Sequence, residues 1–162
     1  MSKYPDLALP LVAVIVMGLA SPLAVAQDAA QPSDREPALS WTADNADLEW
    51  GPCPPFMPET CAIAILHGDP AMDNADVFFK IPPGSNVPMH WHNSAERMML
   101  VSGEMHVTYK GQATVVMLPG TYAYGPARAP HEASCAEKND PCVLFIAFES
   151  PIDAIAGEPP GQ

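Results

Sequence analysis

Residues 84–103 read GSNVPMHWHNSAERMMLVSG, and this stretch decides the fold of the chain. His90 and His92 stand two apart in a run that favours a strand, so their side chains point to the same face of that strand. Glu96 follows after a short polar turn and can supply a carboxylate from the start of the next strand. The pattern predicts two imidazoles and one carboxylate that face a common point.

An isolated pair of histidines at this spacing is most often a surface feature of a polar loop. His131 lies on a later predicted strand and would add a third imidazole to the group. Three imidazoles and one carboxylate suit iron, manganese, zinc, copper or nickel, and they leave coordination positions open. We therefore predict one divalent transition metal ion, bound by His90, His92, Glu96 and His131, whose identity the residues do not fix.

The spacing of five residues in this stretch resembles the complete first motif of the cupin superfamily. Gly84 is followed by five residues and His90, by one residue and His92, by three residues and Glu96, and by six residues and Gly103. Five residues at four fixed spacings are a specific signal. The resemblance implies a small β-barrel, usually a dimer, that binds a metal with the matched residues.

The second motif of the superfamily is matched in part. Gly120, Pro126 and His131 fall at the family's spacings, whereas Arg128 stands in place of a glycine and Cys135 in place of an asparagine. The third imidazole is thus retained. Arg128 would add a cation near the mouth of the barrel, which favours a ligand with a carboxylate or an enolate.

The rest of the chain is typical of an all-β domain, here a small jelly-roll barrel, because twenty Pro and ten Gly divide it into short apolar runs. We expect a flexible N-terminal segment at residues 27–40, the barrel at residues 41–150 and a flexible tail at residues 151–162. Eight strands are predicted, at Ala62–Leu66, Val77–Ile81, Val87–His92, Arg97–Val101, Met105–Tyr109, Thr114–Leu118, His131–Cys135 and Val143–Phe148.

The first 26 residues have the layout of a secretory signal peptide, with Lys3, an apolar run over residues 7–20 and small residues at 24–26. A membrane span is the alternative, but the apolar run is shorter than the roughly 20 residues that cross a bilayer. The segment has no pair of arginines, so we expect export of an unfolded chain. The protein is predicted to be periplasmic or secreted, without membrane contact after cleavage.

Four cysteines in an exported chain favour disulfides. Four allow three pairings, and closeness in sequence favours Cys53 with Cys61 and Cys135 with Cys142, the second pair closing a hairpin. A zinc or redox site is the alternative, but no CxxC spacing is present.

The formal net charge of −12 opposes binding to phosphate backbones, so nucleic acid is excluded as a partner.

Strand parity from Glu96 places Met98 and Leu100 on the metal face, with Met99 and Val101 behind them and Arg97 outside. This predicts a largely apolar wall and a small-molecule ligand that is apolar or aromatic. Part of this set can equally be ordinary core. The predicted pocket residues are Met98, Leu100, Met105, Tyr109, Tyr124 (or Tyr122), Arg128 and Phe145.

Two further histidines are expected outside the site. Within residues 105–109 the apolar side chains share one parity, so His106 should point outward. His67 sits at a predicted strand end, where turn chemistry explains a histidine, although it could rim a pocket.

Three functions remain open. The leading hypothesis is a metal-dependent, dioxygenase-like enzyme that acts on an oxygen-bearing substrate; isomerases and lyases are also common in the superfamily. The second is a binding or sensory module without turnover, and the third is a domain in which the metal only ties strands together.

Overall fold

The computed structural model describes residues 36–137 and 140–161, and its larger compact unit begins at Leu39. The predicted signal peptide and residues 27–35 of the predicted flexible segment lie outside the described residues. Residues 36–40 carry no regular secondary structure. No helix with the length and apolar character of a membrane span occurs in the part of the chain that the structure describes.

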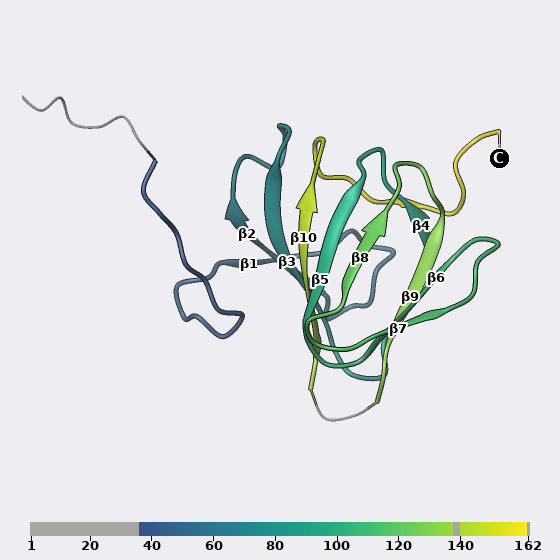
Figure 1. Cartoon of the computed structure of the whole chain (residues 1–162), viewed down its shortest axis with the longest axis horizontal. Coiled ribbons are helices and arrows are strands. Elements are labelled where there is room, and N and C mark those ends of the chain that lie inside the picture. Colours follow the sequence, from purple (N-terminus) through teal and green to yellow (C-terminus); the bar gives the residue numbers. More distant parts are fainter. Residues whose placement is uncertain (1–35, 138–139, 162) are drawn as a thin grey trace, which may run out of the picture. The chain divides into compact units, whose positions relative to one another are not determined.

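Two antiparallel sheets make up the domain (Figure 1). The first has the strand order β1-β2-β3-β10-β5-β8, formed by Trp50–Pro52, Ala62–His67, Ala75–Ile81, Cys142–Phe148, Glu96–Ser102 and Tyr122–Gly125. The second has the order β11-β4-β9-β6-β7, formed by Ile155–Ala156, Asn86–Trp91, His131–Cys135, Met105–Tyr109 and Val115–Met117. This is the all-β jelly-roll architecture that the sequence predicts.

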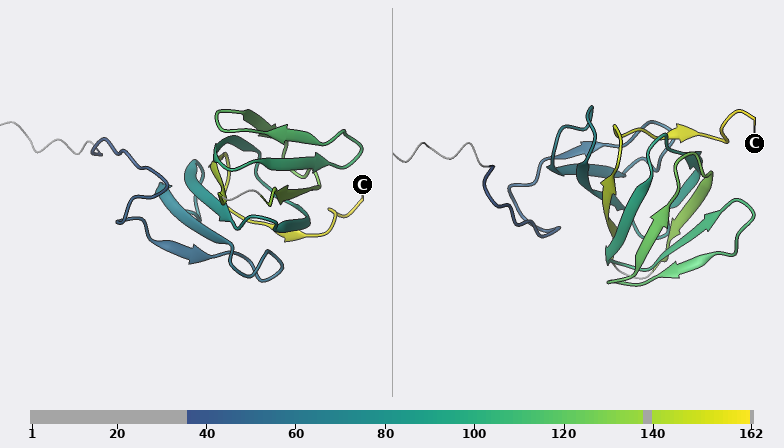
Figure 2. Two further views of the ribbon diagram at one scale, coloured as in Figure 1. Left: turned by 90° about the horizontal axis from the view of Figure 1, so that it is seen from below. Right: turned by 45° about the horizontal axis from the view of Figure 1, so that its top comes forward.

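The core lies between the two sheets, which are seen from two further sides in Figure 2. Met98 and Leu100 of β5 face inward and are almost completely buried, whereas Met99 and Val101 are 44% and 41% exposed. This alternation confirms the predicted parity of the strand. Glu96 shares the inward parity, so β5 carries its carboxylate into the barrel.

All eight predicted strands are present, with ends that differ by at most two residues from the prediction. Three short strands were not predicted, namely β1, β8 and β11. The last of them lies in the segment expected to be a flexible tail. Ile155 and Ala156 pair with Trp91 and His90 of β4, so the described part of this segment is held against the barrel.

Both predicted disulfides are formed, Cys53–Cys61 and Cys135–Cys142. The second does not close a hairpin as expected. Cys135 ends β9 and Cys142 begins β10, and these strands belong to opposite sheets. The bridge therefore joins the two layers of the barrel where the chain crosses between them.

Candidate metal centre

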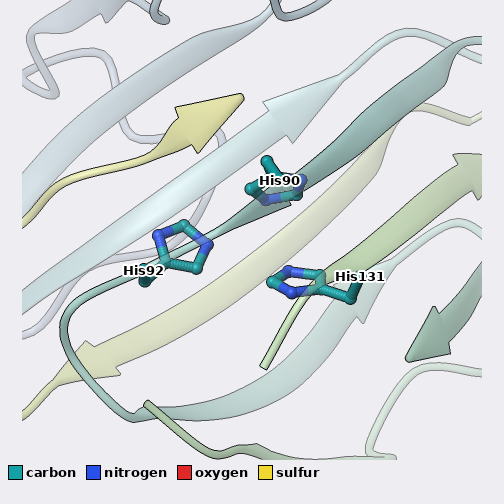
Figure 3. Close-up of side chains that lie close together, drawn as sticks. All are labelled: His90, His92 and His131. Atoms are coloured by element: carbon teal, nitrogen blue, oxygen red, sulfur yellow. The ribbon is translucent and has the colours of Figure 1, made fainter. Parts of the chain in front are cut away.

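Three buried histidines lie close together inside the barrel (Figure 3). His90 is near the end of β4, His92 directly follows that strand, and His131 begins the neighbouring strand β9. One ring nitrogen of each lies within 4.8 Å of the others. Because His90 and His131 are paired across the two strands, the ladder itself fixes two of the three positions.

Each of the three rings faces a main-chain carbonyl with its Nδ1 atom. The Nδ1 of His90 lies 2.8 Å from the Pro88 oxygen, and that of His131 lies 3.0 Å from the Ala129 oxygen. The Nδ1 of His92 faces the Asp153 oxygen. A carbonyl oxygen can only accept, so Nδ1 carries the proton and Nε2 keeps its lone pair. All three rings are therefore preset as metal ligands through Nε2.

Glu96 brings a carboxylate to the same place. Its Oε1 atom lies 3.4 Å from Nε2 of His92, and its Oε2 atom lies 3.9 Å from Nε2 of His131. The side chain is buried, with 3% of the residue exposed. The structure thus brings together the four residues that the sequence singles out as ligands.

Burial sets the protonation of this group. It lowers the pKa of His90 from 6.5 to about 4 and that of His131 to about 3, in each case helped by a neighbouring histidine and opposed by the hydrogen bond to a main-chain carbonyl. Burial also raises the pKa of Glu96 above its usual value of 4.5. Neutral imidazoles are the form that binds a metal, so metal binding needs little proton release from His90 and His131 at neutral pH.

A cavity of about 160 Å³ adjoins the four residues. It is comparable to an apolar protein cavity of about 150 Å³ that holds benzene. Most of its lining is apolar and comes from both sheets, including Val77, Phe79, Met98, Met105, Leu144 and Phe148. The arrangement provides a largely apolar cavity for a small molecule beside the candidate ligands.

The predicted pocket residues divide into several groups. Met98 and Met105 line the cavity, whereas Leu100 belongs to the packed core. Tyr109 packs its ring on His131, with centroids 4.7 Å apart, and lines a separate hollow that it shares with Arg128.

Two predicted pocket residues, Tyr124 and Phe145, lie on the outer face instead. Tyr124 is 52% exposed, and its alternative Tyr122 is 59% exposed. In β8, Tyr124 pairs with Arg97, which points outward. Phe145 packs edge-on against Phe78 on the outer side of its sheet. The inward residues of β10 are those of the other parity, such as Leu144 and Phe148.

The Arg128 guanidinium stacks over the Trp91 ring, 4.8 Å from its centroid, rather than at the cavity. Arg128 also holds a left-handed backbone conformation, with φ of 62°, at the position where the family motif has glycine. Its main-chain N–H donates to the His92 oxygen. The expected role of Arg128 beside a ligand carboxylate is therefore corrected, because its side chain is engaged with Trp91.

The other two histidines lie away from the centre. His106 pairs with Glu104, with 3.0 Å between Nε2 and Oε1, and His67 is exposed at the end of β2. Both placements agree with the expectation that turn or surface chemistry explains these residues.

Sequence reasoning missed the contribution of the C-terminal residues. Ile152, Asp153 and Ala154 line the cavity, and Asp153 also accepts the hydrogen bond from His92. No alternating pattern marks a strand there, because Ile155 is apolar as well as Ala154 and Ala156.

The space beside Glu96 depends on a glycine. A Cβ atom on Gly125 would collide with the Tyr109 hydroxyl and would lie 3.1 Å from Glu96 Oε2. The Tyr109 hydroxyl is buried without a hydrogen-bond partner among the described residues. Gly125 thus allows the Tyr109 hydroxyl and the Glu96 carboxylate to lie together against β8.

Comparison with known proteins places this geometry in a family. Residues 77–148 match the family model of the cupin domain, while no curated protein matches the chain. The DMSP lyase DddQ from Ruegeria pomeroyi DSS-3 is 18% identical, with a TM-score of 0.61, over 78% of this chain and 75% of that chain. A chain from the crystal structures of the DMSP lyases RdDddP and RnDddQII is 17% identical, with a TM-score of 0.59, over 68% of this chain and 63% of that chain.

A third solved structure, a cupin-2 domain from Rhodospirillum rubrum, is 14% identical, with a TM-score of 0.57, over 76% of this chain and 83% of that chain. At these identities the similarity concerns the fold alone. The family match over residues 77–148 and the two facing sheets show that this part of the chain is a cupin domain.

Proposed function

We propose that this cupin domain is a metal-dependent, dioxygenase-like enzyme. It binds one divalent transition metal with His90, His92, His131 and Glu96, and it acts on a small, largely apolar or aromatic substrate that carries an oxygen ligand.

The observation that carries the proposal is the shared orientation of the three imidazoles. Each Nδ1 faces a main-chain carbonyl, so three Nε2 lone pairs are gathered in one buried space next to a carboxylate. Three buried lone pairs without a donor would be costly in an apolar barrel. A bound cation removes that cost and also balances the charge of Glu96.

The cavity supports the proposed class of substrate. Its volume of about 160 Å³ limits the substrate to a small molecule, and its mostly apolar walls favour an apolar or aromatic one. Among the described residues, those that line it include no Ser, Thr, Cys, Tyr, Lys or Arg. The described lining therefore offers no hydroxyl, thiol or amine nucleophile.

A transition metal at such a site supplies open coordination positions for an oxygen-bearing substrate and for dioxygen. The protein's part is to hold the three rings in one tautomer, to keep a carboxylate beside them and to orient the substrate by its apolar surface.

A non-redox lyase or isomerase is the second candidate, and Asp153 favours it. Asp153 lines the same cavity; its carboxylate oxygens accept from Asn93, and the lone pair that each oxygen retains can take a proton from a bound substrate. The DMSP lyases among the solved structures of this fold belong to that class of reaction.

Metal content tests the site. Purified wild-type protein should hold about one equivalent of a divalent metal, and His90→Ala or His131→Ala should lower the affinity by at least about tenfold because a ligand is lost. His106→Ala is the matched control, since this histidine has a carboxylate partner but lies away from the cavity. Full metal content in a variant with both His90→Ala and His131→Ala would refute the site.

Turnover tests the chemistry. Protein loaded with Fe²⁺, Mn²⁺, Ni²⁺, Cu²⁺ or Zn²⁺ is mixed with small aromatic and dicarbonyl compounds while dissolved oxygen is recorded. We expect substrate-dependent oxygen uptake that His90→Ala abolishes. Product formation without oxygen uptake would favour the lyase or isomerase, and binding without any product would favour a non-catalytic module.

A further inference from the structure

The chain that follows β10 crosses the barrel as a strap, here defined as residues 152–157. At its start, the Ile152 N–H donates to the Pro70 oxygen at 2.9 Å, and at its end, the Gly157 N–H donates to the Met89 oxygen at 2.8 Å. Between these points β11 pairs with β4. The first three residues of the strap line the cavity. The strap is therefore attached at both ends while it forms part of the cavity wall.

The strap holds one candidate ligand that the barrel does not hold itself. His90 and His131 each take their carbonyl acceptor from two residues earlier in the chain, so their strands fix them locally. His92 takes its acceptor from Asp153, which is 61 residues away. The orientation of His92, and the ring nitrogen that carries its proton, thus depend on the position of a distant segment.

The side chain of Asp153 fixes the position of that acceptor. Its Oδ1 atom accepts from the Asn93 N–H at 2.9 Å, and its Oδ2 atom accepts from the Asn93 side-chain amide. Asn93 directly follows His92. Asp153 therefore contacts two consecutive residues: its main-chain oxygen accepts from the His92 imidazole, and its carboxylate accepts from Asn93. This pair of contacts sets the strap in register with the end of β4.

We propose that Asp153 is a positioning residue for His92, which makes the C-terminal strap a part of the metal site. The proposal rests on the metal binding inferred above. If the carbonyl of Asp153 moves away, the His92 ring can rotate or take the other tautomer, which presents an N–H where the ion needs a lone pair. Loss of such a supporting contact typically costs about 10- to 100-fold in metal affinity.

The tautomer of His92 can be observed without any metal. In ¹⁵N-labelled apoprotein at pH 7.5, long-range ¹H–¹⁵N correlations separate a protonated Nδ1 from a protonated Nε2 in each ring. We expect Nδ1 to be protonated in His90, His92 and His131 of the wild type. In Asp153→Ala only His92 should change, toward a mixture of tautomers, because the other two rings keep their local acceptors.

Metal affinity gives the second measurement, by competition of Zn²⁺ between the protein and a chromophoric chelator. Asp153→Ala should weaken binding by about 10-fold or more. Asp153→Asn keeps an oxygen for the Asn93 N–H and should bind nearly as well as the wild type. Asn45→Ala is the matched control and should leave the affinity unchanged; it removes a side-chain oxygen that accepts from the Asp47 N–H at 2.8 Å, in a turn before β1.

The outcomes separate the two proposals. A wild type that binds no Zn²⁺ would refute the proposed function. A wild type that binds Zn²⁺, with unchanged affinity and unchanged His92 tautomer in Asp153→Ala, would refute the role of Asp153 alone. Circular dichroism of each variant identifies general unfolding. If Asp153→Ala does not fold, Asn93→Ala decides the matter, because it removes the side-chain amide that donates to Asp153 Oδ2 and keeps the Asp153 side chain. Asn93→Ala should then shift the His92 tautomer and weaken Zn²⁺ binding, and a folded Asn93→Ala with both unchanged would refute the role of Asp153.

Discussion

The imidazoles of His90 and His131 are kept neutral by the interior of the barrel, and this neutrality has a cost in acid. Their pKa values are about 4 and about 3 in the folded chain, against 6.5 in the unfolded chain. As the pH falls below 6.5, these two imidazoles bind protons in the unfolded chain but not yet in the folded chain. Stability is therefore lost between pH 6.5 and about 4 for His90, and down to about 3 for His131.

We predict that the free energy of unfolding of the apoprotein falls by on the order of 3 kcal/mol from His90 alone between pH 7 and pH 4. The raised pKa of Glu96 acts in the opposite sense, since it lowers stability as the pH rises above 4.5. Urea titrations in EDTA should therefore be compared with those of a variant with His90→Gln and His131→Gln. If the free energy of unfolding depended on pH equally in the two proteins, the prediction would be contradicted.

The space at Gly125 is the second feature that a single substitution tests. Gly125→Ala forces a methyl group against the Tyr109 hydroxyl and the Glu96 carboxylate. We expect a loss of about 1–3 kcal/mol in the free energy of unfolding, as for other overpacked cores, together with lower metal occupancy. Gly51→Ala is the control, because its Cβ would lie 3.8 Å from the Ile63 oxygen, an ordinary contact. Equal stability of the two variants would speak against the clash.

The candidate ligands could be predicted from the sequence because each depends on local spacing and on chemistry that few residue types provide. The pocket residues could not be predicted equally well, because they depend on strand register. Both faces of β10 are covered, and its residues, including Phe145 and Phe148, form one uninterrupted apolar run. The sequence pattern therefore does not indicate which alternate residues of β10 face inward. Tyr124 was misplaced for a related reason, because its short strand β8 went unpredicted.

Among the elements, the loop closed by Cys53–Cys61 lies over the candidate metal centre. Pro54 and Met57 of this loop line the cavity, and the Phe56 ring lies 6.0 Å from the His90 ring, measured between centroids. The other bridge, Cys135–Cys142, joins the two sheets where β9 leads into β10. The two disulfides therefore stabilise different features, one the cover of the cavity and the other the closure of the barrel.

We predict that replacing either pair of cysteines by alanine lowers the free energy of unfolding by about 2–3 kcal/mol, on the loop-entropy estimate for short loops. Only Cys53→Ala with Cys61→Ala should also speed the exchange of bound metal with a chelator, because only that pair secures the cavity cover. Peptide mapping of unreduced wild type should recover both predicted pairs. Free thiols, or Cys53 joined to Cys142, would contradict them.

The C-terminal segment shows what the sequence hides at the scale of elements. Its Pro and Gly residues indicate a loose tail, yet β11 is only two residues long and gains its place from pairing with β4 and from the contacts of Asp153. A strand of that length has almost no pattern of its own. The barrel strands were predictable because they are longer and separated by turn residues.

For the molecule as a whole, the question is where the chain meets its metal. The predicted signal peptide and the two disulfides support an oxidising compartment outside the cytoplasm. The predicted leader has no pair of arginines, so the chain should cross unfolded. The three imidazoles come from β4 and its end and from β9, which are separated by some 40 residues of chain, and they converge only once these two strands have paired. Metal binding is then coupled to folding after export.

We therefore predict that the metal found in the protein follows its compartment. Affinities of nitrogen and oxygen sites rise from manganese through iron to copper, with zinc below copper, so supply and geometry alone can favour iron. Protein recovered from the periplasm should carry zinc or copper more often than protein made without its leader in the cytoplasm of the same host. The check is elemental analysis of both samples, purified without chelators. Equal iron content in both would contradict the prediction, and it would mean that the site itself selects iron, which in turn would strengthen the case for oxygen chemistry over a lyase.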